Sequence, residues 1–300
     1  MDKSVLISGG SGLVGSRLTE LLLDKGYQVA HLSRSASEGK VKTIKWDIEK
    51  MSLDPSSIEP YSYIINLAGA GIVAEAWTEE RKKVIQESRT NTTKLLKKAI
   101  EKNDRKPISF VSASAVGFYG FETSDHIFNE DDNPGNDFLA ETCLKWEESI
   151  DEVAALGIPT AKIRIGIVLS NKGGALKEMA KPLKYNVGAP LGSGKQYMPW
   201  IHIDDLCRIF IHALENKLQG AFNAAAPNQV NNESFTRILA KTLKKPLWLP
   251  HIPAFVMKMI LGSRALLVLE GSRVSSKKIQ ERGFEFEFEF LEDALKEIYK

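Results

Sequence analysis

The sequence has little cysteine. Only Cys143 and Cys207 occur among 300 residues, and they lie far apart, without the spacing of metal ligands. Both fall in helical, apolar patterns, so we expect reduced thiols in the core of a cytoplasmic protein rather than a disulfide framework. No metal site is predicted from these residues.

Neither sign of charge predominates. The 40 basic and 38 acidic residues are well mixed and leave a formal net charge of +2. Because no basic stripe is interleaved with aromatic residues, we expect no nucleic-acid partner. The length is typical of one large domain, or of one domain with a smaller lobe.

Long hydrophobic runs are missing as well. The longest apolar stretch, residues 254–269, is interrupted by Lys258, Gly262 and Arg264. It therefore predicts a packed helix pair or turn rather than a membrane span. An apolar strand pattern already starts at Ser4, so no signal peptide is expected. We expect no membrane partner.

The beginning of the chain carries the strongest pattern. A short apolar run over residues 4–8 is followed by three regularly spaced glycines and then by a helical leucine pattern. Such a strand, turn and helix aim backbone N–H groups and the positive end of the helix dipole at one spot, which suits a pyrophosphate. The alternative is a structural glycine turn in another α/β protein. The predicted dinucleotide contacts are Gly9, Ser11, Gly12, Leu13, Val14 and Gly15.

The second strand indicates which dinucleotide binds. A cofactor with a free 2′-hydroxyl usually meets an acidic residue at the end of this strand, about 20 residues past the glycines. Residues 27–32 instead lead into Ser33 and Arg34. A guanidinium suits a 2′-phosphate, which favours NADP (NADPH) over NAD, although Arg34 is also explained as a solvated loop charge. Asp47, at the end of a candidate third strand, is expected to flank the adenine.

Strands and helices alternate through the first two-thirds of the chain. Further strands are predicted at 63–69, 108–114 and 159–169, and helices at 78–102 and 139–156. This order predicts an α/β fold with a doubly wound parallel (Rossmann) sheet. Ligands bind beyond the carboxyl ends of such strands. That rule places around one crevice Arg34 and residues 9–15, 67–70, 112–114 and 165–168. It adds Leu67, Ala68, Gly69 and Ser112 to the predicted cofactor contacts.

The last third departs from this pattern. We expect residues 1–170, joined by 196–226, to form the NADP-binding domain, and 171–195 and 227–300 to form a smaller C-terminal α+β lobe on the substrate side. Asp204 or Asp205 is predicted to cap a helix that runs to Glu215. The alternating Phe and Glu of residues 284–290 predict a strand with one packed phenylalanine face, covered by a helix over 291–299.

These motifs together resemble the extended, epimerase-like branch of the short-chain dehydrogenase/reductase superfamily. The matching stretches are residues 9–15, 66–69, 112–114 and 201–205. The chain is more closely similar to an atypical group labelled epimerase family protein, or cell-division-inhibitor-like. That likeness rests on residues 114–120 and 192–202, and on a tail from about 249 to 295 that resembles a C-terminal domain of unknown function. The resemblance implies NADP contacts by Ser33, Arg34, Leu67, Ala68, Arg89 and Val168.

The chain departs from the superfamily at its proton relay. These enzymes use a serine with a Tyr-x-x-x-Lys pair, in which the lysine lowers the tyrosine pKa. Ser114 stands where the serine is expected, but residues 138–144 hold no tyrosine and no lysine. Tyr119 is the tyrosine near Ser114 in sequence, with packing or a lid as its alternative role. Ser114 and Tyr119 are therefore the catalytic candidates.

A second departure concerns the substrate. Sugar-nucleotide epimerases usually hold the substrate diphosphate with an arginine a few residues before the Asp-Asp pair, and here that place is Met198. A thioether does not bind phosphate, so a nucleotide sugar is disfavoured. Lys195 or Arg164 remains available for an anionic group, with surface charge and strand-end packing as the alternatives.

Two functional hypotheses follow from the sequence. The first is an NADP-dependent oxidoreductase or epimerase that acts on an unidentified small molecule. The second is a non-catalytic NADP-binding sensor or interaction protein, which the loss of the Tyr-x-x-x-Lys pair favours. A homodimer formed through two helices is a partner that this fold allows.

Overall fold

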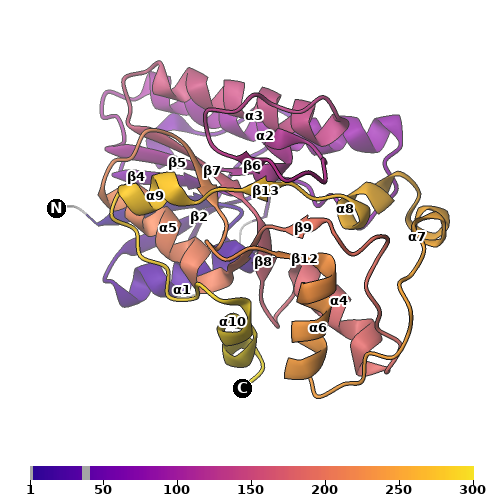
Figure 1. Ribbon diagram of the computed structural model, residues 1–300. Coiled ribbons are helices and arrows are strands. Elements are labelled where there is room, and N and C mark those ends of the chain that lie inside the picture. The colour runs from indigo at the N-terminus through magenta and orange to yellow at the C-terminus, as the bar shows by residue number, and fades with distance from the viewer. Residues whose placement is uncertain (1–2, 36–40) are drawn as a thin grey trace.

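A seven-stranded parallel sheet forms the centre of the computed structural model, which describes residues 3–35 and 41–300 (Figure 1). The strand order is β11-β7-β5-β4-β1-β2-β3. β1 lies between β2 and β4, with Val5 opposite Val29 on one side and Tyr63 on the other. The strands are β1 Ser4–Ser8, β2 Gln28–Ser33, β3 Lys42–Lys45, β4 Tyr63–Asn66, β5 Ser109–Ala115, β7 Thr160–Ile165 and β11 Gly220–Ala224.

Helices cover both faces of this sheet. α1 (Leu13–Asp24) packs beside α5 (Ile203–Glu215) on one face, and α2 (Glu79–Lys102) packs beside α3 (Phe138–Ala154) on the other (Figure 1). All five residues of β1 are buried, as expected for a central strand that is covered on both sides. Three short 3-10 turns lie in the connections: η1 Pro55–Ser57, η2 Val116–Tyr119 and η3 Gly262–Ala265.

The single strand expected over residues 159–169 is divided in two. β7 ends at Ile165 in the central sheet, and β8 (Ile167–Leu169) pairs with β10 (Trp200–His202) instead. Gly166 lies at the break, where a Cβ would be 2.0 Å from the carbonyl oxygen of Pro199. The close crossing of these two backbones redirects the chain out of the sheet.

A second hydrophobic cluster lies beyond β8. It joins Leu176 of α4 (Gly174–Lys184), Phe235 of α6 (Asn232–Thr242) and Leu295 of α10 (Leu291–Ile298) around the fully buried Trp200. The remaining elements are short: β6 Ile127–Phe128, β9 Tyr197–Met198, β12 Val230–Asn231, α7 Ala254–Leu261, α8 Leu266–Leu269, β13 Arg273–Val274 and α9 Lys277–Glu281.

The predicted strand at residues 284–290 is wrong, although part of its burial pattern is present. Phe284 and Phe286 join the main core, whereas Phe290 is 57% exposed. The backbone N–H groups of Glu287 and Phe288 donate to the Asp205 carboxylate, at 3.0 and 2.9 Å, and this extended segment is not assigned as a strand. The buried Asp205 carboxylate takes two backbone N–H groups that a strand at this position would donate to a neighbouring strand.

Two further expectations need correction. Asp204 and Asp205 do not cap α5, because the Nδ1 atom of His202 accepts the Asp204 N–H at 3.2 Å. Residues 254–269 do form a helix pair, and among the described residues no helix is long and apolar enough to cross a membrane. The pair is not fully packed, however, since α7 has no buried residue.

Candidate cofactor-binding site

Two glycines fix the turn between β1 and α1 by close backbone packing. Gly9 has φ +72°, and a Cβ there would lie 2.9 Å from the carbonyl carbon of Leu67. At Gly15 a Cβ would lie 2.3 Å from the carbonyl oxygen of Gly9. Neither position accepts a larger residue, so the turn is held tightly against the end of β4.

Gly12 is packed less tightly than Gly9 and Gly15. Its φ is −74°, which any residue adopts, and a Cβ there would meet only the Gly9 carbonyl oxygen, at 3.3 Å. Gly12 is the N-cap of α1, and no side chain in the described parts of the chain caps this helix. α3 and α6, by contrast, are capped by Asp137 and Asn231. An exposed, uncapped helix start beside a bare backbone leaves N–H donors available to an anion.

The residues expected near the adenosine end lie beyond β2 and β3. Ser33 is half-buried at the last position of β2, and Arg34 follows it as an exposed residue. The Asp47 carboxylate accepts the Lys50 N–H at 2.9 Å, in a tight turn after β3. Arg34 is thus accessible to a ligand, whereas Asp47 already takes part in its own turn.

The end of β4 is tied to β1 by one hydroxyl. Ser8 Oγ accepts the N–H groups of Leu67 and Ala68, each at 3.2 Å, and donates to Asn66 at 2.6 Å. Leu67 and Ala68 are half-buried beside the glycine turn, and the next residue, Gly69, is exposed. Ser112 of β5 lies opposite Asn66 of β4 and is fully buried. Its hydroxyl accepts a hydrogen bond from Asn66 Nδ2 at 3.3 Å.

Arg89 of α2 lies next to Gly69 without an acidic partner in the described parts of the chain. A Cβ on Gly69 would lie 3.3 Å from the Cγ atom of Arg89. The guanidinium donates to the Ile85 carbonyl at 2.8 Å and lies over the Trp146 ring, 5.3 Å from its centroid. Burial lowers the pKa of Arg89. A half-buried cation without a carboxylate partner suits an anionic ligand.

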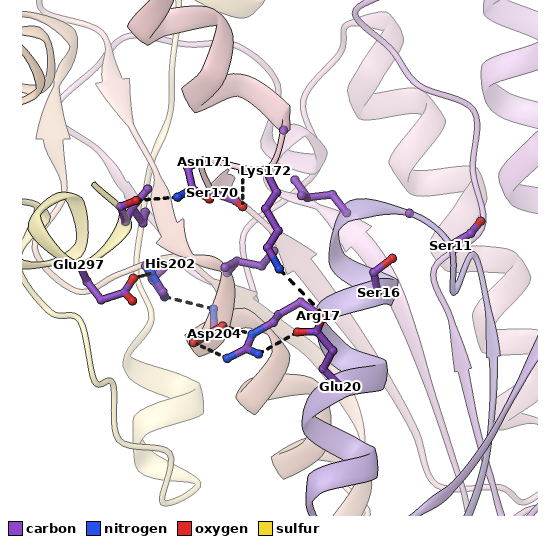
Figure 2. Close-up of a pocket in the computed structure, with 15 residues that line it drawn as sticks. Ser11, Ser16, Arg17, Glu20, Ser170, Asn171, Lys172, His202, Asp204 and Glu297 are labelled. Carbon is purple, nitrogen blue, oxygen red and sulfur yellow. Dashed lines mark hydrogen bonds and ion pairs between the residues drawn. The ribbon is translucent and has the colours of Figure 1, made fainter. Parts of the chain in front are cut away.

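A pocket of about 560 Å³ opens from the glycine turn (Figure 2). Its walls are the start of α1, the loop between β8 and α4, the start of α5 and the end of α10. Val168 reaches the same region, because a Cβ on Gly174 would touch both the Val168 carbonyl oxygen and the Leu13 side chain. The loop after β8 therefore closes one side of the turn.

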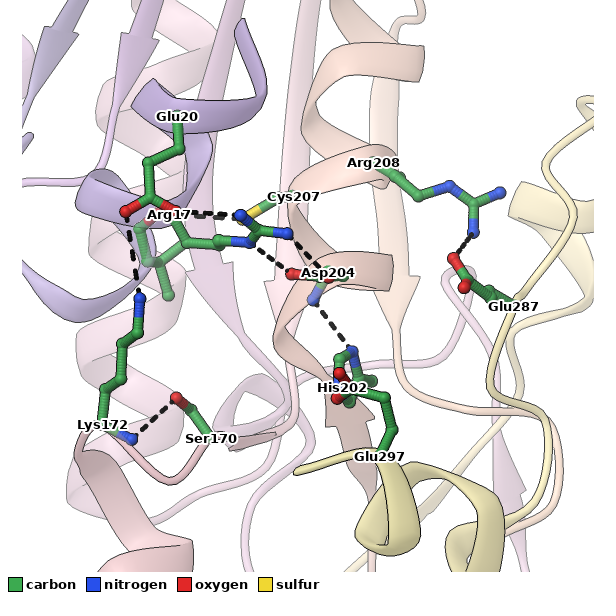
Figure 3. Close-up of polar contacts among 11 residues, drawn as sticks. Arg17, Glu20, Ser170, Lys172, His202, Asp204, Cys207, Arg208, Glu287 and Glu297 are labelled. Atoms are coloured by element: carbon green, nitrogen blue, oxygen red, sulfur yellow. Dashed lines mark hydrogen bonds and ion pairs between the residues drawn. The ribbon is translucent and has the colours of Figure 1, made fainter. Parts of the chain in front are cut away.

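Ion pairs hold this pocket together (Figure 3). Arg17 of α1 binds Asp204 of α5 through two hydrogen bonds, of 2.7 and 3.0 Å. Burial acts to raise the pKa of Asp204, but the bond from Arg17 outweighs it and lowers that pKa. The side chain of His202 bonds Glu297 of α10 at 3.1 Å. The C-terminal helix is thus fastened to the start of α5.

The catalytic candidates lie in a second network, which is buried beneath the crevice. Ser114 is 2% exposed and donates to Glu147 of α3 at 2.7 Å. Glu147 also pairs bidentately with Arg164, at 2.8 and 2.9 Å. Arg164 in turn donates to the Tyr119 hydroxyl at 2.9 Å, and Tyr119 donates to Asn223 at 2.8 Å. Arg164 is therefore committed to strand-end packing rather than free for an anionic substrate.

Electrostatics keep the proton on Tyr119. Burial raises the pKa of its hydroxyl to about 12, although the nearby Arg164 opposes this. Burial also acts against the charged form of Arg164, but the bonds to Glu147 outweigh it and raise the Arg164 pKa. The catalytic roles of Ser114 and Tyr119 stay predictions.

The start of α3, where the resemblance drawn from the sequence puts the Tyr-x-x-x-Lys pair, presents apolar and thiol groups. A Cβ on Gly117 would lie 3.7 Å from the Leu139 Cβ and 3.8 Å from the Cys143 Sγ, so both side chains face η2. Burial raises the pKa of the Cys143 thiol to about 12. Neither group exchanges a proton readily near neutral pH.

Sequence reasoning missed Glu147 and the Arg17–Asp204 pair. The paired residues are 17 positions apart for Arg164 and Glu147, and 187 apart for Arg17 and Asp204. No local spacing marks such partners. One available signal was Arg164 itself, because a charged residue in an apolar strand requires a buried partner.

Comparison with known proteins places this arrangement in a family. The model of the NAD dependent epimerase/dehydratase family matches residues 5–225. The chain belongs to this family. Residues 252–298 of this epimerase-family chain match a domain of unknown function, DUF1731. The resemblance drawn from the sequence, with its C-terminal domain of unknown function, is confirmed.

Two relatives cover almost the whole chain. The epimerase family protein YfhF of Bacillus subtilis is 35% identical over 300 residues, which are 98% of this chain and 97% of that protein. The epimerase family protein SDR39U1 of Homo sapiens is 35% identical over 305 residues, which are 98% of this chain and 99% of that protein.

Solved structures confirm the predicted fold class. Human SDR39U1 (isoform 2), crystallised with NADPH, superposes with a TM-score of 0.87 at 32% identity over 99% of both chains. A nucleoside-diphosphate sugar epimerase from Corynebacterium glutamicum gives a TM-score of 0.80 at 29% identity, over 98% of this chain and 57% of that one. UDP-glucuronic acid 4-epimerase from Bacillus cereus, at 18% identity and a TM-score of 0.80, shares the fold. The chain has a Rossmann-like parallel sheet with a smaller C-terminal region.

Proposed function

We propose that this epimerase-family chain binds NADP(H) and performs an oxidoreductase or epimerase-like reaction on an unidentified small molecule. The observation that carries the proposal is the uncapped start of α1, where Gly12 stays bare although its φ does not require a glycine. A diphosphate approaching the backbone explains that glycine, because a Cβ would stand in its way. The NADPH bound to human SDR39U1 supports the same cofactor here.

Different residues around the crevice contact different parts of the cofactor in this proposal. The turn and the α1 start take the diphosphate, Ser33 and Arg34 the 2′-phosphate, and the residues after β4 and β8 the nicotinamide end. Bound NADP(H) supplies or accepts a hydride. The proposed contacts are Gly9, Ser11, Gly12, Leu13, Val14, Gly15, Ser33, Arg34, Asp47, Leu67, Ala68, Gly69, Arg89, Ser112 and Val168.

The two parts of the chain have separate tasks in this proposal. Residues 1–170 with 196–226 hold the cofactor, and residues 171–195 with 227–300 form the substrate side. The support is the second hydrophobic cluster, in which side chains of α4, α6 and α10 pack together against Trp200 of the cofactor part. Binding NADP alone does not require such a lobe.

Ser114 and Tyr119 either transfer a proton in the reaction or position the end of β5. The buried network favours a positioning role for Ser114 and Tyr119, in which they fix the end of β5 through Glu147 and Arg164. A positioning role predicts that Ser114→Ala lowers stability as well as any turnover, because Glu147 loses a donor. A direct role predicts a loss of turnover with stability unchanged.

A non-catalytic NADP-binding sensor or interaction protein is the second candidate. Leu139 and Cys143 face η2 where a proton relay is needed, and Ser114 is already bonded to Glu147. This candidate predicts tight NADPH binding, no slow oxidation of bound NADPH, and a partner protein recovered only with cofactor present. NADPH turnover on any member of a broad carbonyl panel decides for the enzyme.

The cofactor proposal is tested by calorimetric titration of wild type and Arg34→Ala with NADPH and NADH. Arg34→Ala weakens the binding of NADPH far more than the binding of NADH if the guanidinium holds the 2′-phosphate. Arg237→Ala is the matched control, because Arg237 is an exposed arginine of α6 whose ion pair, within the described residues, is with Glu233. Equal losses of both nucleotides in Arg34→Ala remove the 2′-phosphate role.

A further inference from the structure

Six large exposed apolar side chains lie on two segments of the C-terminal lobe, residues 185–187 and 248–260. Two segments far apart in sequence lie side by side there, since Trp248 Nε1 donates to the Asn186 carbonyl at 3.0 Å and Ile252 N–H donates to the Pro190 carbonyl at 2.9 Å. We call this surface the edge patch. Its six members are each at least half exposed: Tyr185 73%, Val187 50%, Trp248 67%, Phe255 69%, Met259 77% and Ile260 64%.

α7 contributes half of the patch in an unusual way. Its sequence, Ala-Phe-Val-Met-Lys-Met-Ile-Leu, is apolar at every position except Lys258, yet none of its residues is buried. Apolar helices are normally buried on at least one face, because leaving such side chains in water is unfavourable. An exposed patch of this kind marks a surface that contacts something else.

The charged residues next to the patch in sequence have one sign, although Glu233 of α6 lies 4.0 Å from His251. Residues 179–203 and 234–269 contain no aspartate and no glutamate, although acidic and basic residues are balanced over the whole chain. None of Lys244, Lys245 and Lys258 has a carboxylate partner in the parts of the chain that the structure describes. The basic residues nearest the patch in sequence are Lys181, Lys184, Lys244, Lys245, Lys258 and Arg264.

We propose that the edge patch docks on an anionic phospholipid surface. A helix that lies in a membrane interface typically inserts aromatic and Met side chains among the lipid headgroups and has unpaired lysines around them. The edge patch has these features, which differ from those of a membrane-spanning helix. Each lysine near such a surface adds attraction to anionic lipid. The proposal replaces our expectation, drawn from hydropathy alone, that a membrane is not a partner.

The shape and charge of the patch favour a membrane over a second copy of the chain. Two copies related by a two-fold axis at the patch would bring lysines against lysines, which opposes association. α7 also lies at the outer edge of the molecule in Figure 1, away from the central sheet. A projecting edge suits a flat surface, which needs no matching groove.

The test is co-sedimentation of the full chain with vesicles. We expect binding to phosphatidylcholine vesicles that contain about one-third phosphatidylglycerol, little binding to pure phosphatidylcholine, and release at high salt. Met259→Glu and the double variant Lys244→Glu/Lys245→Glu should each weaken binding at least about tenfold. Val84→Glu is the matched control, because Val84 is 46% exposed on α2, away from the patch. Unchanged melting temperatures show that each variant is folded.

Trp248 gives a second readout that needs no variant. It is far more exposed than Trp46, Trp146 and Trp200, so its emission should shift to the blue on binding, and Trp248→Phe should remove the shift. Absence of binding to the anionic vesicles overturns the proposal. So does wild-type binding by Met259→Glu, a dimer that Met259→Glu abolishes, or equally strong retention on polyglutamate.

Discussion

Glu147→Gln should strongly destabilise the protein, because it leaves a buried arginine without its counter-ion. Glu147 and Arg164 side chains are each 4% exposed, and Glu147 accepts from Arg164 twice and from Ser114 once. Removing one member of a buried ion pair costs about 3–5 kcal/mol. For a chain of this size that loss lowers Tm by roughly 6 °C or more.

A double variant separates the net contribution of the ion pair to the free energy of unfolding from the loss caused by removing one partner alone. Glu147→Leu with Arg164→Met removes both charges, so we expect it to be more stable than Glu147→Gln alone. The measurement is chemical denaturation followed by circular dichroism, with Glu141→Gln, an exposed glutamate of the same helix, as the control. An unfolding free energy for Glu147→Gln within about 0.5 kcal/mol of wild type would refute this account of the network.

Three further changes test other parts of the structure. Gly12→Ala should lower Tm far less than Gly15→Ala does and should abolish NADPH binding, and retained binding in a titration would exclude the diphosphate from this backbone. Asp204→Asn removes an acid whose pKa Arg17 lowers, so the stability lost relative to wild type should be full at neutral pH and should vanish as pH falls through the lowered pKa. Unfolding curves across acid pH measure this, and a difference independent of pH would contradict the pairing. Asp205→Ala leaves the N–H groups of Glu287 and Phe288 without their acceptor, so limited proteolysis should begin near residues 283–290, and wild-type resistance there would show that Asp205 does not hold the tail.

The parts of the fold that depend on local spacing were predictable. The strand, glycine turn and helix at residues 4–24 need only neighbours in sequence, and α2 begins directly after Thr78, whose side chain caps it. The alternation of strands and helices predicts a parallel sheet with right-handed crossovers, but it does not fix the strand order. The same reasoning gathers the glycine turn, Arg34 and the end of β4 at one edge of the sheet.

The features that the sequence did not reveal depend on distant partners. Gly166 divides a continuous apolar run only because the Pro199 backbone crosses it. The Phe-Glu alternation at 284–290 has the period of a strand, yet Asp205, about 80 residues earlier, takes its N–H groups instead. Arg164 looked available for substrate until the structure showed Glu147 bonded to it. A residue pattern predicts which face is buried, but not which partner buries it.

The most direct test of the central claim is a calorimetric titration of the unaltered protein with NADPH and then with NADH. The account predicts saturable binding of one NADPH per chain, and weaker binding of NADH because it lacks the 2′-phosphate. Absence of binding by either nucleotide would contradict the claim that the glycine turn, the bare start of α1 and Arg34 form a cofactor site.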